Sequence, residues 1–299
     1  MELNEERKGE VFLFFGSLFW SLFPIIVILS LNSVNAIFSL ASAYLVATLF
    51  FITIMAYRKL WHELLDWQSL KCALGAAFFI GILFYGFTFF GMQFTSAGDA
   101  SIILLMQVFF SYVILGPLLK KEHIKTSDLF GAFLMIVGAF LVIYQGSFSM
   151  NFGSLIILIG TIFPPLGNYL MQKARKNISS VSILFIRNSI SSIFLFIIGF
   201  IFLESPTMIQ WKIALPFIII NGILIFGLSK ILWIEAIHRI PITRAMSLGT
   251  GAPALTLIFA FFILKEIPTI WQFLGFLPII VGTLIILKSK IIKKKVYVN

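Results

Sequence analysis

One run of residues occurs twice in this chain, 144 positions apart. Lys121-Glu122, Gly131 and Ile136-Val137-Gly138 return as Lys265-Glu266, Gly275 and Ile280-Val281-Gly282. The same offset pairs two glycines near the start of each copy, Gly9 with Gly153 and Gly16 with Gly160. A repeat of this length indicates two copies of one structural unit. We therefore expect two domains, residues 1–147 and residues 148–299.

Composition indicates whether this chain folds in water or in a lipid bilayer. The chain is 60% hydrophobic and 11% charged, and 35 of its 299 residues are Phe. A water-soluble fold of this length cannot bury so much apolar side chain, whereas a bilayer accommodates it. The long continuous apolar runs lack the alternation of a membrane barrel, so helices are expected.

Apolar stretches long enough to cross a bilayer predict ten transmembrane helices. Each copy then holds five, and because five is odd the copies must be inverted in the membrane. The fold class is an all-α integral membrane protein of ten helices in two inverted five-helix repeats, the usual construction of a secondary transporter. The expected ranges are 10–31, 36–57, 70–92, 97–119, 128–146, 152–173, 180–203, 212–233, 242–264 and 269–288.

Basic residues predict the orientation. With the N-terminus inside, 18 of the 22 Lys and Arg residues fall in inner segments, Lys212 and Lys265 fall outside, and Arg187 and Lys230 fall within helices. This bias predicts cytoplasmic N- and C-termini. It also accounts for the net charge of +10 without a nucleic-acid partner. We expect the tail Lys288 to Lys295 to contact anionic lipids of the inner leaflet.

Enzyme chemistry has little support. No Ser/His/Asp set, paired carboxylates or metal-ligand spacing occurs, and Cys72 is the single cysteine. His62, His123 and His238 fall at inner loops or helix ends, where solvated side chains are expected rather than pH sensors. We expect neither a cofactor nor a bound metal.

Polar and aromatic residues near the membrane midplane are the candidates for substrate binding, because an unpaired polar group in lipid is costly and tends to face a cavity. The alternative is that amides bridge helices and aromatics fill the bundle. Counting from the expected helix ends selects Trp20, Tyr44, Gln107, Asn221 and Thr250, with Tyr85 slightly further out.

Arg187 lies about 10 Å, seven residues, into the seventh expected helix. It is either a fixed cation for a substrate carboxylate or phosphate, or a snorkelling or ion-paired arginine with Glu235 as its partner. Its counterpart in the first half is Ala43, so charge recognition would be one-sided. Lys230 is expected to snorkel to the inner face.

Helix-breaking residues are the second kind of candidate. Pro24, Pro164, Pro165 and Pro253, the last beside Gly249 and Gly251, interrupt expected helices, as is common at carrier sites. Pro164 and Pro165 would free the carbonyls of Gly160 and Thr161. Such breaks are either static kinks or hinges and carbonyl ligands. No Asp or Glu is expected at the midplane, so a buried carboxylate proton relay has no support.

These features together resemble the EamA-type branch of the drug/metabolite transporter superfamily. The resemblance covers the whole chain and rests on the inverted five-helix halves and on a Lys-Glu turn between helices four and five and again between nine and ten. The family's small-residue helix start, mid-helix Pro, Glu in the next turn and Gly in the next helix are matched by Thr243 to Ala245, Pro253, Glu266 and Gly275. The first half matches Ser96 to Ala100, Glu122 and Gly131, but has Val108 or Phe109 in place of the Pro.

The resemblance implies a solute carrier of the cell inner (plasma) membrane that exports small polar metabolites such as amino acids, working by alternating access at a midplane cavity between the repeats. A small molecule and the lipid bilayer are the expected partners, with a homodimer possible. Two alternatives stay open: a flippase or carrier of a nucleotide- or lipid-linked substrate, which would need more cationic groups than Arg187, and a non-transporting membrane scaffold.

Overall fold

The structure is a computed structural model that describes residues 5–119, 126–145 and 151–296, and within these ranges all regular structure is helical. The turn residues Lys121 and Glu122 and the expected domain boundary at 147 lie outside the described residues. Ten elements precede residue 146: α1 (Glu5–Trp20), α2 (Phe23–Leu31), α3 (Ala36–Arg58), η1 (Leu60–Leu65), α4 (Trp67–Ala76), η2 (Ala77–Phe84), α5 (Tyr85–Met92), α6 (Ala97–Ile103), α7 (Met106–Leu119) and α8 (Thr126–Tyr144). Ten follow: α9 (Phe152–Gly160), α10 (Pro164–Ala174), α11 (Ser180–Phe202), α12 (Met208–Ile220), η3 (Asn221–Ser229), α13 (Lys230–Arg239), α14 (Ile242–Leu248), η4 (Gly249–Gly251), α15 (Ala252–Ile263) and α16 (Ile270–Val296).

These elements combine into ten membrane spans, which confirms the expected fold class. Seven helical stretches within the described ranges are long and apolar enough to cross a bilayer, and three shorter apolar helices complete the set at Leu129–Tyr144, Gly249–Ile263 and Ile270–Ile286. In chain order the spans are α1 with α2, α3, α4 with η2 and α5, α6 with α7, α8, α9 with α10, α11, α12 with η3 and α13, α14 with η4 and α15, and α16; they are numbered 1 to 10 below.

Span 8 differs from its expected range of 212–233 at both ends. It begins at Met208 because Thr207 and Gln210 form a capping box, in which each side chain bonds the backbone N–H of the other residue. It ends at Arg239 instead of 233. The last span is also longer than expected, since α16 continues to Val296 instead of 288.

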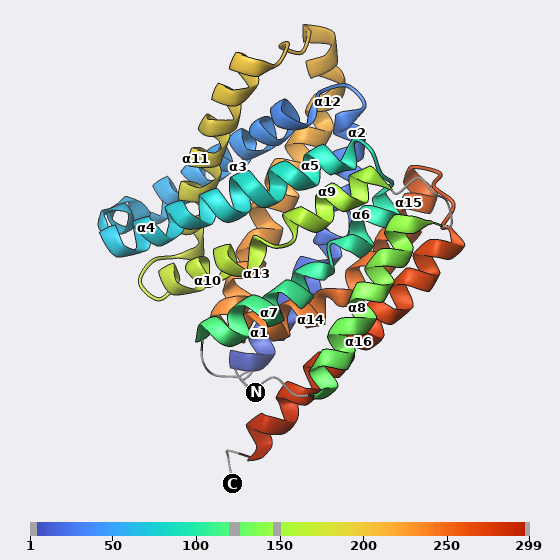
Figure 1. The fold of residues 1–299 in the computed structure, drawn as a ribbon. Helices are drawn as coiled ribbons and strands as arrows, with labels where there is room; N and C mark the ends of the chain where they lie inside the picture. The colour runs from blue at the N-terminus through green and yellow to red at the C-terminus, as the bar shows by residue number, and fades with distance from the viewer. Residues whose placement is uncertain (1–4, 120–125, 146–150, 297–299) are drawn as a thin grey trace.

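The two halves are inverted, as helix contacts between them show. A Cβ added to Gly131 would lie 2.7 Å from the carbonyl oxygen of Gly282, and one added to Gly275 would lie 2.6 Å from that of Gly138. Because the lower number on α8 meets the higher number on α16, these helices run antiparallel, side by side (Figure 1). Repeat-equivalent helices that run antiparallel are related by an axis in the membrane plane.

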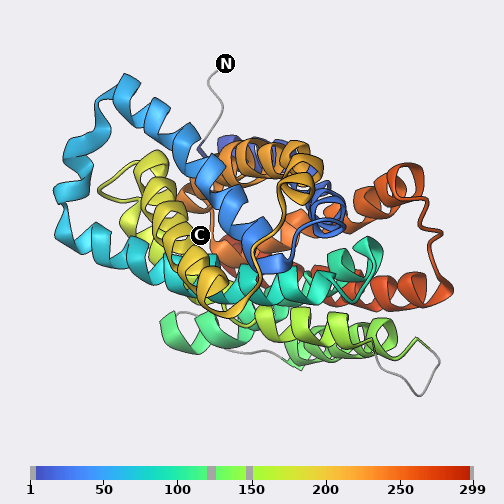
Figure 2. The same cartoon turned by 90° about the horizontal axis from the view of Figure 1, so that it is seen from above.

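The second and seventh spans pack in the same way. Ser192 on α11 donates a hydrogen bond to the carbonyl of Ala41 on α3 (2.8 Å), and Gly199 on α11 faces Phe38 nearer the start of α3. Figure 2 shows α3 and α11 lying alongside each other. The start of α1 and the end of α16 lie at the same end of the molecule, as an even number of spans requires (Figure 1).

A π-helical segment occurs at the same place in each half. Ala77–Phe84 (η2) and Asn221–Ser229 (η3) begin 144 residues apart, in spans 3 and 8. A π turn closes with an i→i+5 bond and so takes one more residue than an α turn. Residues that follow it are therefore rotated by about 100° relative to a continuous α-helix.

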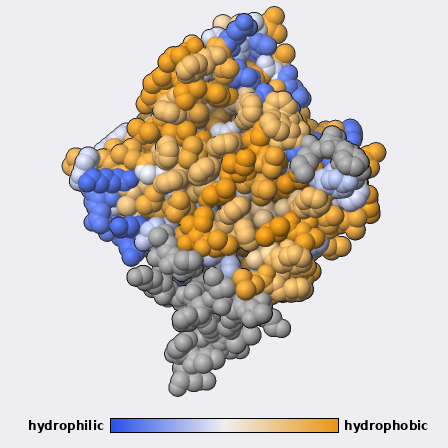
Figure 3. Space-filling view, viewed as in Figure 1, coloured by the Kyte–Doolittle hydropathy of each residue, from blue (hydrophilic) through white to orange (hydrophobic). Residues whose placement is uncertain are grey.

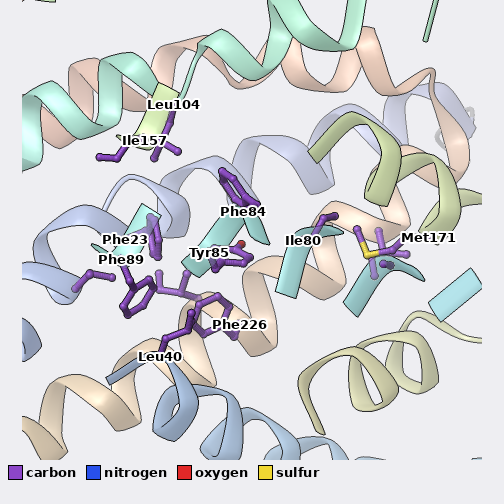
Figure 4. Packing of buried hydrophobic residues seen from close by; sticks show 14 of the residues in the cluster. Phe23, Leu40, Ile80, Phe84, Tyr85, Phe89, Leu104, Ile157, Met171 and Phe226 are labelled. Carbon is purple, nitrogen blue, oxygen red and sulfur yellow. The ribbon is translucent and has the colours of Figure 1, made fainter. Parts of the chain in front are cut away.

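The surface is apolar across most of the face in Figure 3, and hydrophilic residues gather at its edges, around the start of α4 and the α11–α12 connection. On α11, Phe200 and Ile201 are 64% and 66% exposed, as lipid-facing residues are. Inside the bundle, Phe23, Tyr85, Phe89 and Phe226 pack ring against ring (Figure 4). This aromatic cluster borders the cavity described next.

Candidate functional site

A cavity opens between the two halves beside the aromatic cluster. Its volume, measured as the space open to the centre of a water molecule, is about 80 Å³. One water needs roughly 10–15 Å³ by the same measure, so the cavity holds several waters or a small solute. Its walls come from seven of the ten spans: Leu13, Gly16, Ser17, Trp20, Pro24, Ile80, Phe84, Tyr85, Ser101, Leu104, Leu105, Gln107, Pro164, Asn168, Met171, Arg187, Ser229, Lys230, Trp233, Gly249, Ala252, Pro253 and Thr256.

Seven of the residues selected from sequence line this cavity: Trp20, Tyr85, Gln107, Arg187, Pro24, Pro164 and Pro253. Four selected residues lie outside its lining: Tyr44, Asn221, Thr250 and Pro165. All four are buried. Tyr44, Asn221 and Thr250 were selected by depth along a helix and Pro165 as a helix breaker, and neither criterion specifies the face of the helix on which a residue lies.

Tyr44 lies behind the cavity wall. Its hydroxyl donates a hydrogen bond to the carbonyl of Gly81 (3.1 Å), inside η2, and its ring centroid is 4.6 Å from that of Phe226. An irregular segment such as η2 frees backbone groups, so this bond satisfies one of them. Tyr44 therefore braces the wall that carries Tyr85. Asn221 begins η3, and its buried Oδ1 has no hydrogen-bond partner among the described residues.

Helix breaks surround the cavity. Span 1 is interrupted at Ser21 and Leu22, just before Pro24, and span 6 between Gly160 and Pro164. Span 9 passes through the 3₁₀ turn η4 before Pro253. The carbonyl of Gly160, which we expected Pro164 to free, accepts a hydrogen bond from the N–H of Phe163 (3.2 Å). For Gly160 the expectation was wrong, because a 3₁₀ turn replaces the lost α-helical bond.

Span 4 has a break that sequence reasoning missed. Helix α6 ends at Ile103 and α7 starts at Met106 without a proline between them. Bonds of the 3₁₀ type carry the chain across, from the N–H of Leu105 to the carbonyl of Ile102 (3.0 Å) and from that of Val108 to Leu105 (2.9 Å). The break is 144 residues before Leu248 and Gly249, so the repeat offset was the signal that could have located it.

Arg187 is fully buried within α11, and its contacts are neutral. Its Nε and Nη2 donate to Oδ1 of Asn188 (3.2 and 3.0 Å), and its Nη1 approaches the thioether sulfur of Met171 at 3.9 Å. Figure 4 shows Met171 beside Ile80 at this end of the cavity. Within the described ranges no carboxylate pairs with this guanidinium.

The ion pair considered between Arg187 and Glu235 does not form. Glu235 is taken by Arg175, whose Nε lies 2.9 Å from its carboxylate, and by Arg239, whose Nη1 lies 2.6 Å away; Ser180 also donates to it. Glu235 lies near the end of span 8 that is on the side of the N-terminus, called the inner end below, and these two arginines meet it there. Arg187 is left deeper in the bundle.

Lys230 does not snorkel, contrary to expectation. Its Nζ lies in the cavity 3.4 Å from the ring centroid of Trp20 and 5.9 Å from that of Tyr85. The expected end of span 8 at residue 233 placed Lys230 three residues from the inner surface. The helix instead ends at Arg239, nine residues after Lys230. That is about 13 Å, too deep for a lysine side chain to reach water at the inner face.

The π segment η3 determines where Lys230 points. Lys230 is the first residue after η3, and the extra residue of the π turn rotates it about the helix axis. Tyr85 is the first residue after η2 in the other half. The two π segments thus deliver a cation and an aromatic ring to the same cavity.

Asn168 and Trp233 are further cavity residues that sequence reasoning missed. The indole Nε1 of Trp233 donates to Oδ1 of Asn168 at 2.8 Å, and the amide nitrogen of Asn168 has no acceptor in the part of the chain that the structure describes. A buried amide facing a cavity is a hydrogen-bond donor available to a solute. They were not selected because both lie close to the expected inner ends of their spans, at residues 173 and 233, and not near the midplane.

Polar contacts join the spans at the inner end of the cavity. Beyond the Glu235 pairs, Arg239 bonds Glu5 of α1 (3.0 Å), and Arg244 of α14 lies 2.6 Å from Glu10. Spans 1, 6, 8 and 9 are thereby tied together. Partly exposed ion pairs of this kind contribute about 0.2–1 kcal/mol each, so they can exchange for solvent.

A second set of contacts joins spans at the outer end. Asp99 of α6 accepts hydrogen bonds from Gln145 (2.7 Å), Asn151 (3.1 Å) and Gln272 (2.9 Å). Glu266, in the loop before α16, accepts from the backbone N–H groups of Ala97 and Gly98 at the start of α6. Burial raises the pKa of Glu266 above its ordinary value, these N–H groups offset part of the rise, and the charge of Asp99 adds to it.

The cavity holds groups that can recognise a polar solute, namely one guanidinium, one ammonium, two amides and four aromatic side chains. Within the described ranges no cluster of three or more His, Cys, Asp or Glu side chains is arranged to hold a metal ion. The cavity brings polar and aromatic groups of both inverted halves together, and polar contacts join the spans near both of their ends.

Comparison with known proteins agrees with this architecture. The chain is 26% identical over 222 residues to the uncharacterized transporter YoaV of Bacillus subtilis (strain 168), covering 72% of this chain and 75% of that protein. It is 27% identical over 202 residues to an uncharacterized transporter of Methanothermobacter thermautotrophicus, covering 66% of this chain and 58% of that protein. One crystal structure of a protein superposes with a TM-score of 0.68 over 93% of this chain and 96% of its own, at 15% identity, which shows the fold.

A family model matches the chain twice, once in each half. The matched residues are 7–144 and 151–288, and the model describes the EamA-like transporter family. The matches cover most of the chain and separate at the loop between α8 and α9. With its ten spans, inverted halves and central cavity, the protein belongs to the EamA-like transporter family.

Proposed function

We propose that the protein is a secondary transporter that exports small polar metabolites, amino acids among them, by alternating access at the cavity between its halves. The observation that carries this proposal is the cavity itself: buried donors and aromatic rings from both halves meet where four helices are interrupted. A midplane site at broken helices between inverted repeats is the arrangement on which alternating access depends.

The contacts at the two ends of the cavity support the proposal. At the inner end they are ion pairs of arginines with Glu5, Glu10 and Glu235, and at the outer end they are hydrogen bonds to Asp99 and Glu266. The two sets lie at opposite ends of the spans, so one can open while the other stays closed. Opening the inner set admits solute from one side, and opening the outer set releases it on the other.

The size of the cavity favours small solutes over the alternative of a nucleotide- or lipid-linked substrate. Sites for drug-sized ligands measure about 300–1,000 Å³, and this cavity is several times smaller. We further propose that residues 1–147 and 148–299 move as the two halves, in the inner membrane with both termini cytoplasmic. In that orientation the arginine ion pairs face the cytoplasm.

Counterflow in liposomes tests the function. The purified protein is reconstituted into liposomes preloaded with a mixed pool of amino acids, carboxylates and phosphate esters, and uptake of each labelled member is measured. Saturable uptake that unlabelled solute competes away is expected for one class of small polar metabolite. Absence of counterflow for the whole pool, with a folded protein verified by chromatography and circular dichroism, would contradict a transport function.

Arg187→Ala should weaken transport of any substrate that carries a carboxylate or phosphate. Loss of one buried charge-assisted bond costs about 1.5–3 kcal/mol, so KM should rise about ten- to hundredfold while the protein remains folded. Arg58→Ala is the matched control, because Arg58 is exposed at the end of α3 and lies outside the cavity. Unchanged kinetics in Arg187→Ala would show that the guanidinium does not contact the substrate.

A further inference from the structure

Two cationic side chains face one cavity that offers them no carboxylate. Arg187 comes from α11 and Lys230 from α13, and among the described residues that line the cavity there is neither Asp nor Glu. Charges held away from water are costly unless an opposite charge accompanies them. The cavity is therefore complementary to a negatively charged solute.

The guanidinium is arranged to accept such a partner. Its contacts to Asn188 and Met171 involve a neutral amide oxygen and a weakly accepting thioether, so its charge is not neutralised. A planar guanidinium binds carboxylate or phosphate oxygens in pairs, with a fixed geometry. Arg187 also lies in a helix whose packing holds its backbone, because the neighbouring Ser191 and Ser192 bond carbonyls of η2 and α3.

The ammonium of Lys230 is a second and separate point of positive charge. It rests on the face of Trp20, and in the described part of the chain it makes neither a salt bridge nor a hydrogen bond. A cation over an indole ring is stabilised in part, but the ring carries no net negative charge. A solute anion is the partner that would complete the neutralisation.

Both cations come from the second half, and the repeat does not duplicate them. The first-half positions equivalent to Arg187 and Lys230 are Ala43 and Gly86. The first half contributes Trp20, Tyr85 and Gln107 instead. One wall of the cavity is thus cationic and the facing wall is aromatic and neutral, which orients an anionic solute with its charged groups toward α11 and α13.

We infer that the substrate is a small organic dianion. A dicarboxylate would be held by Arg187 at one carboxylate and by Lys230 at the other, whereas the single phosphate of a phosphate monoester would be shared by both cations. This inference rests on the proposed function and narrows its substrate class. A neutral amino acid fits less well, since its ammonium would share the cavity with two cations, and none of the described cavity residues supplies a carboxylate to pair with it. A diamine fits least.

The test separates the substrate class from the transport function. Counterflow of labelled succinate, glycerol 3-phosphate, lactate, alanine and putrescine is measured in proteoliposomes at pH 7.5, and binding of the same five compounds to the detergent-solubilised protein is followed by tryptophan fluorescence, because Trp20 and Trp233 line the cavity. For succinate or glycerol 3-phosphate, we expect a Kd from fluorescence and a KM for counterflow that are at least tenfold lower than those for lactate. Alanine and putrescine should bind more weakly than lactate.

Variants of Lys230 identify the second contact. Lys230→Met should raise KM for the dianion at least tenfold and change that for lactate less than about twofold, whereas Lys230→Arg, which keeps the charge and verifies that the site tolerates substitution, should retain most of the affinity. Lys71→Met is the matched control, because Lys71 also lies over an indole ring, that of Trp67 at 5.0 Å, but is exposed and outside the cavity.

The outcomes are distinguishable. Exchange of alanine or putrescine without binding or exchange of either dianion overturns the inference and leaves the transporter intact. Dianion exchange that Lys230→Met does not alter also overturns it. Dianion binding that Lys230→Met weakens, in a folded protein that exchanges none of the panel, supports the anion site and contradicts the transport function.

Discussion

At the scale of single residues, Glu63 shows how a loop carboxylate secures the start of a span. It lies in η1, where its Oε2 accepts hydrogen bonds from the backbone N–H of Ser179 (2.7 Å), the hydroxyl of Ser179 (2.7 Å) and that of Ser182 (2.6 Å). Ser179 is the N-cap of α11. Glu63 therefore ties the loop after span 2 to the beginning of span 7, which carries Arg187.

Glu63→Gln should lower stability in a pH-dependent manner. Burial raises the pKa of Glu63, but the bonds from Ser182 and Ser179 outweigh it and hold the pKa below its ordinary value of 4.5. A carboxyl with a depressed folded-state pKa stabilises the protein above its unfolded pKa, and this stabilisation is lost as pH falls through the folded pKa. We expect Glu63→Gln to cost about 1 kcal/mol at pH 7 and less as pH falls below 4.5.

Thermal unfolding in detergent at a series of pH values measures this difference. Glu204→Gln is the control, since Glu204 is exposed in the outer loop after α11. A Tm difference between wild type and Glu63→Gln that is constant from pH 7 to pH 4 would contradict the role given to the carboxylate.

The residues of the cavity were only partly predictable. Trp20, Gln107 and Arg187 were selected by depth along an assumed α-helix, and depth is readable from sequence because rise per residue is constant. Lys230 and Asn168 were missed because their position depends on where the helix ends and on which face they lie. Both depend on the capping and packing of other segments.

At the scale of elements, the tightest contact in the bundle is that of α8 with α16. A Cβ on Gly138 would collide with the carbonyl oxygen of Gly275, and one on Gly282 with that of Gly131. Glycines seven residues apart lie on one face of each helix, so the two backbones meet at two levels. The repeat supplies this pair of glycines to each half, so both helices present a face on which a close approach is possible.

Gly138→Ala should loosen this contact. The added methyl meets backbone, which cannot rotate away, so the helices must separate at a cost of about 1–3 kcal/mol. Gly86→Ala in α5 is the control, because a Cβ there meets nothing within 4 Å and alanine favours a helix over glycine. Thermal unfolding in detergent is the measurement, and equal Tm values for the two variants would contradict the close approach.

The π segments were not predictable in the same way. Neither Ala77–Phe84 nor Asn221–Ser229 contains a proline, and both read as ordinary apolar helix. Their matching positions in the two halves appear only in the structure. A π turn is stabilised by what packs against it, here the Tyr44 hydroxyl on the carbonyl of Gly81, and such a contact has no local sequence signal.

At the scale of the whole molecule, the orientation in the membrane that we propose rests on the charge bias and can be measured directly. In a Cys72→Ala background, a single cysteine at Ser205 in the α11–α12 loop should react on intact cells with a membrane-impermeant maleimide. A single cysteine at Lys176 in the α10–α11 loop should react only after permeabilisation. Both positions are exposed, so accessibility depends on the side of the membrane. Reaction of Lys176→Cys on intact cells would reverse the proposed orientation.

The number of spans, the duplication and its inversion could be derived from the sequence, because each depends on quantities that are summed along the chain. Apolar length decides whether a segment crosses a bilayer, the repeat offset marks equivalent segments, and an odd number of helices in each copy requires inversion. The family resemblance used the same local marks. The fold needed no knowledge of contacts.

The composition of the cavity was decided by tertiary structure. Lys230 lies over Trp20, Glu235 is engaged by Arg175, and no carboxylate of the described residues pairs with Arg187. These are relations between segments far apart in the chain. They depend on the face each helix presents after its breaks and π turns. Sequence placed the polar residues at a depth in the membrane, and only packing between the halves determined which of them meet.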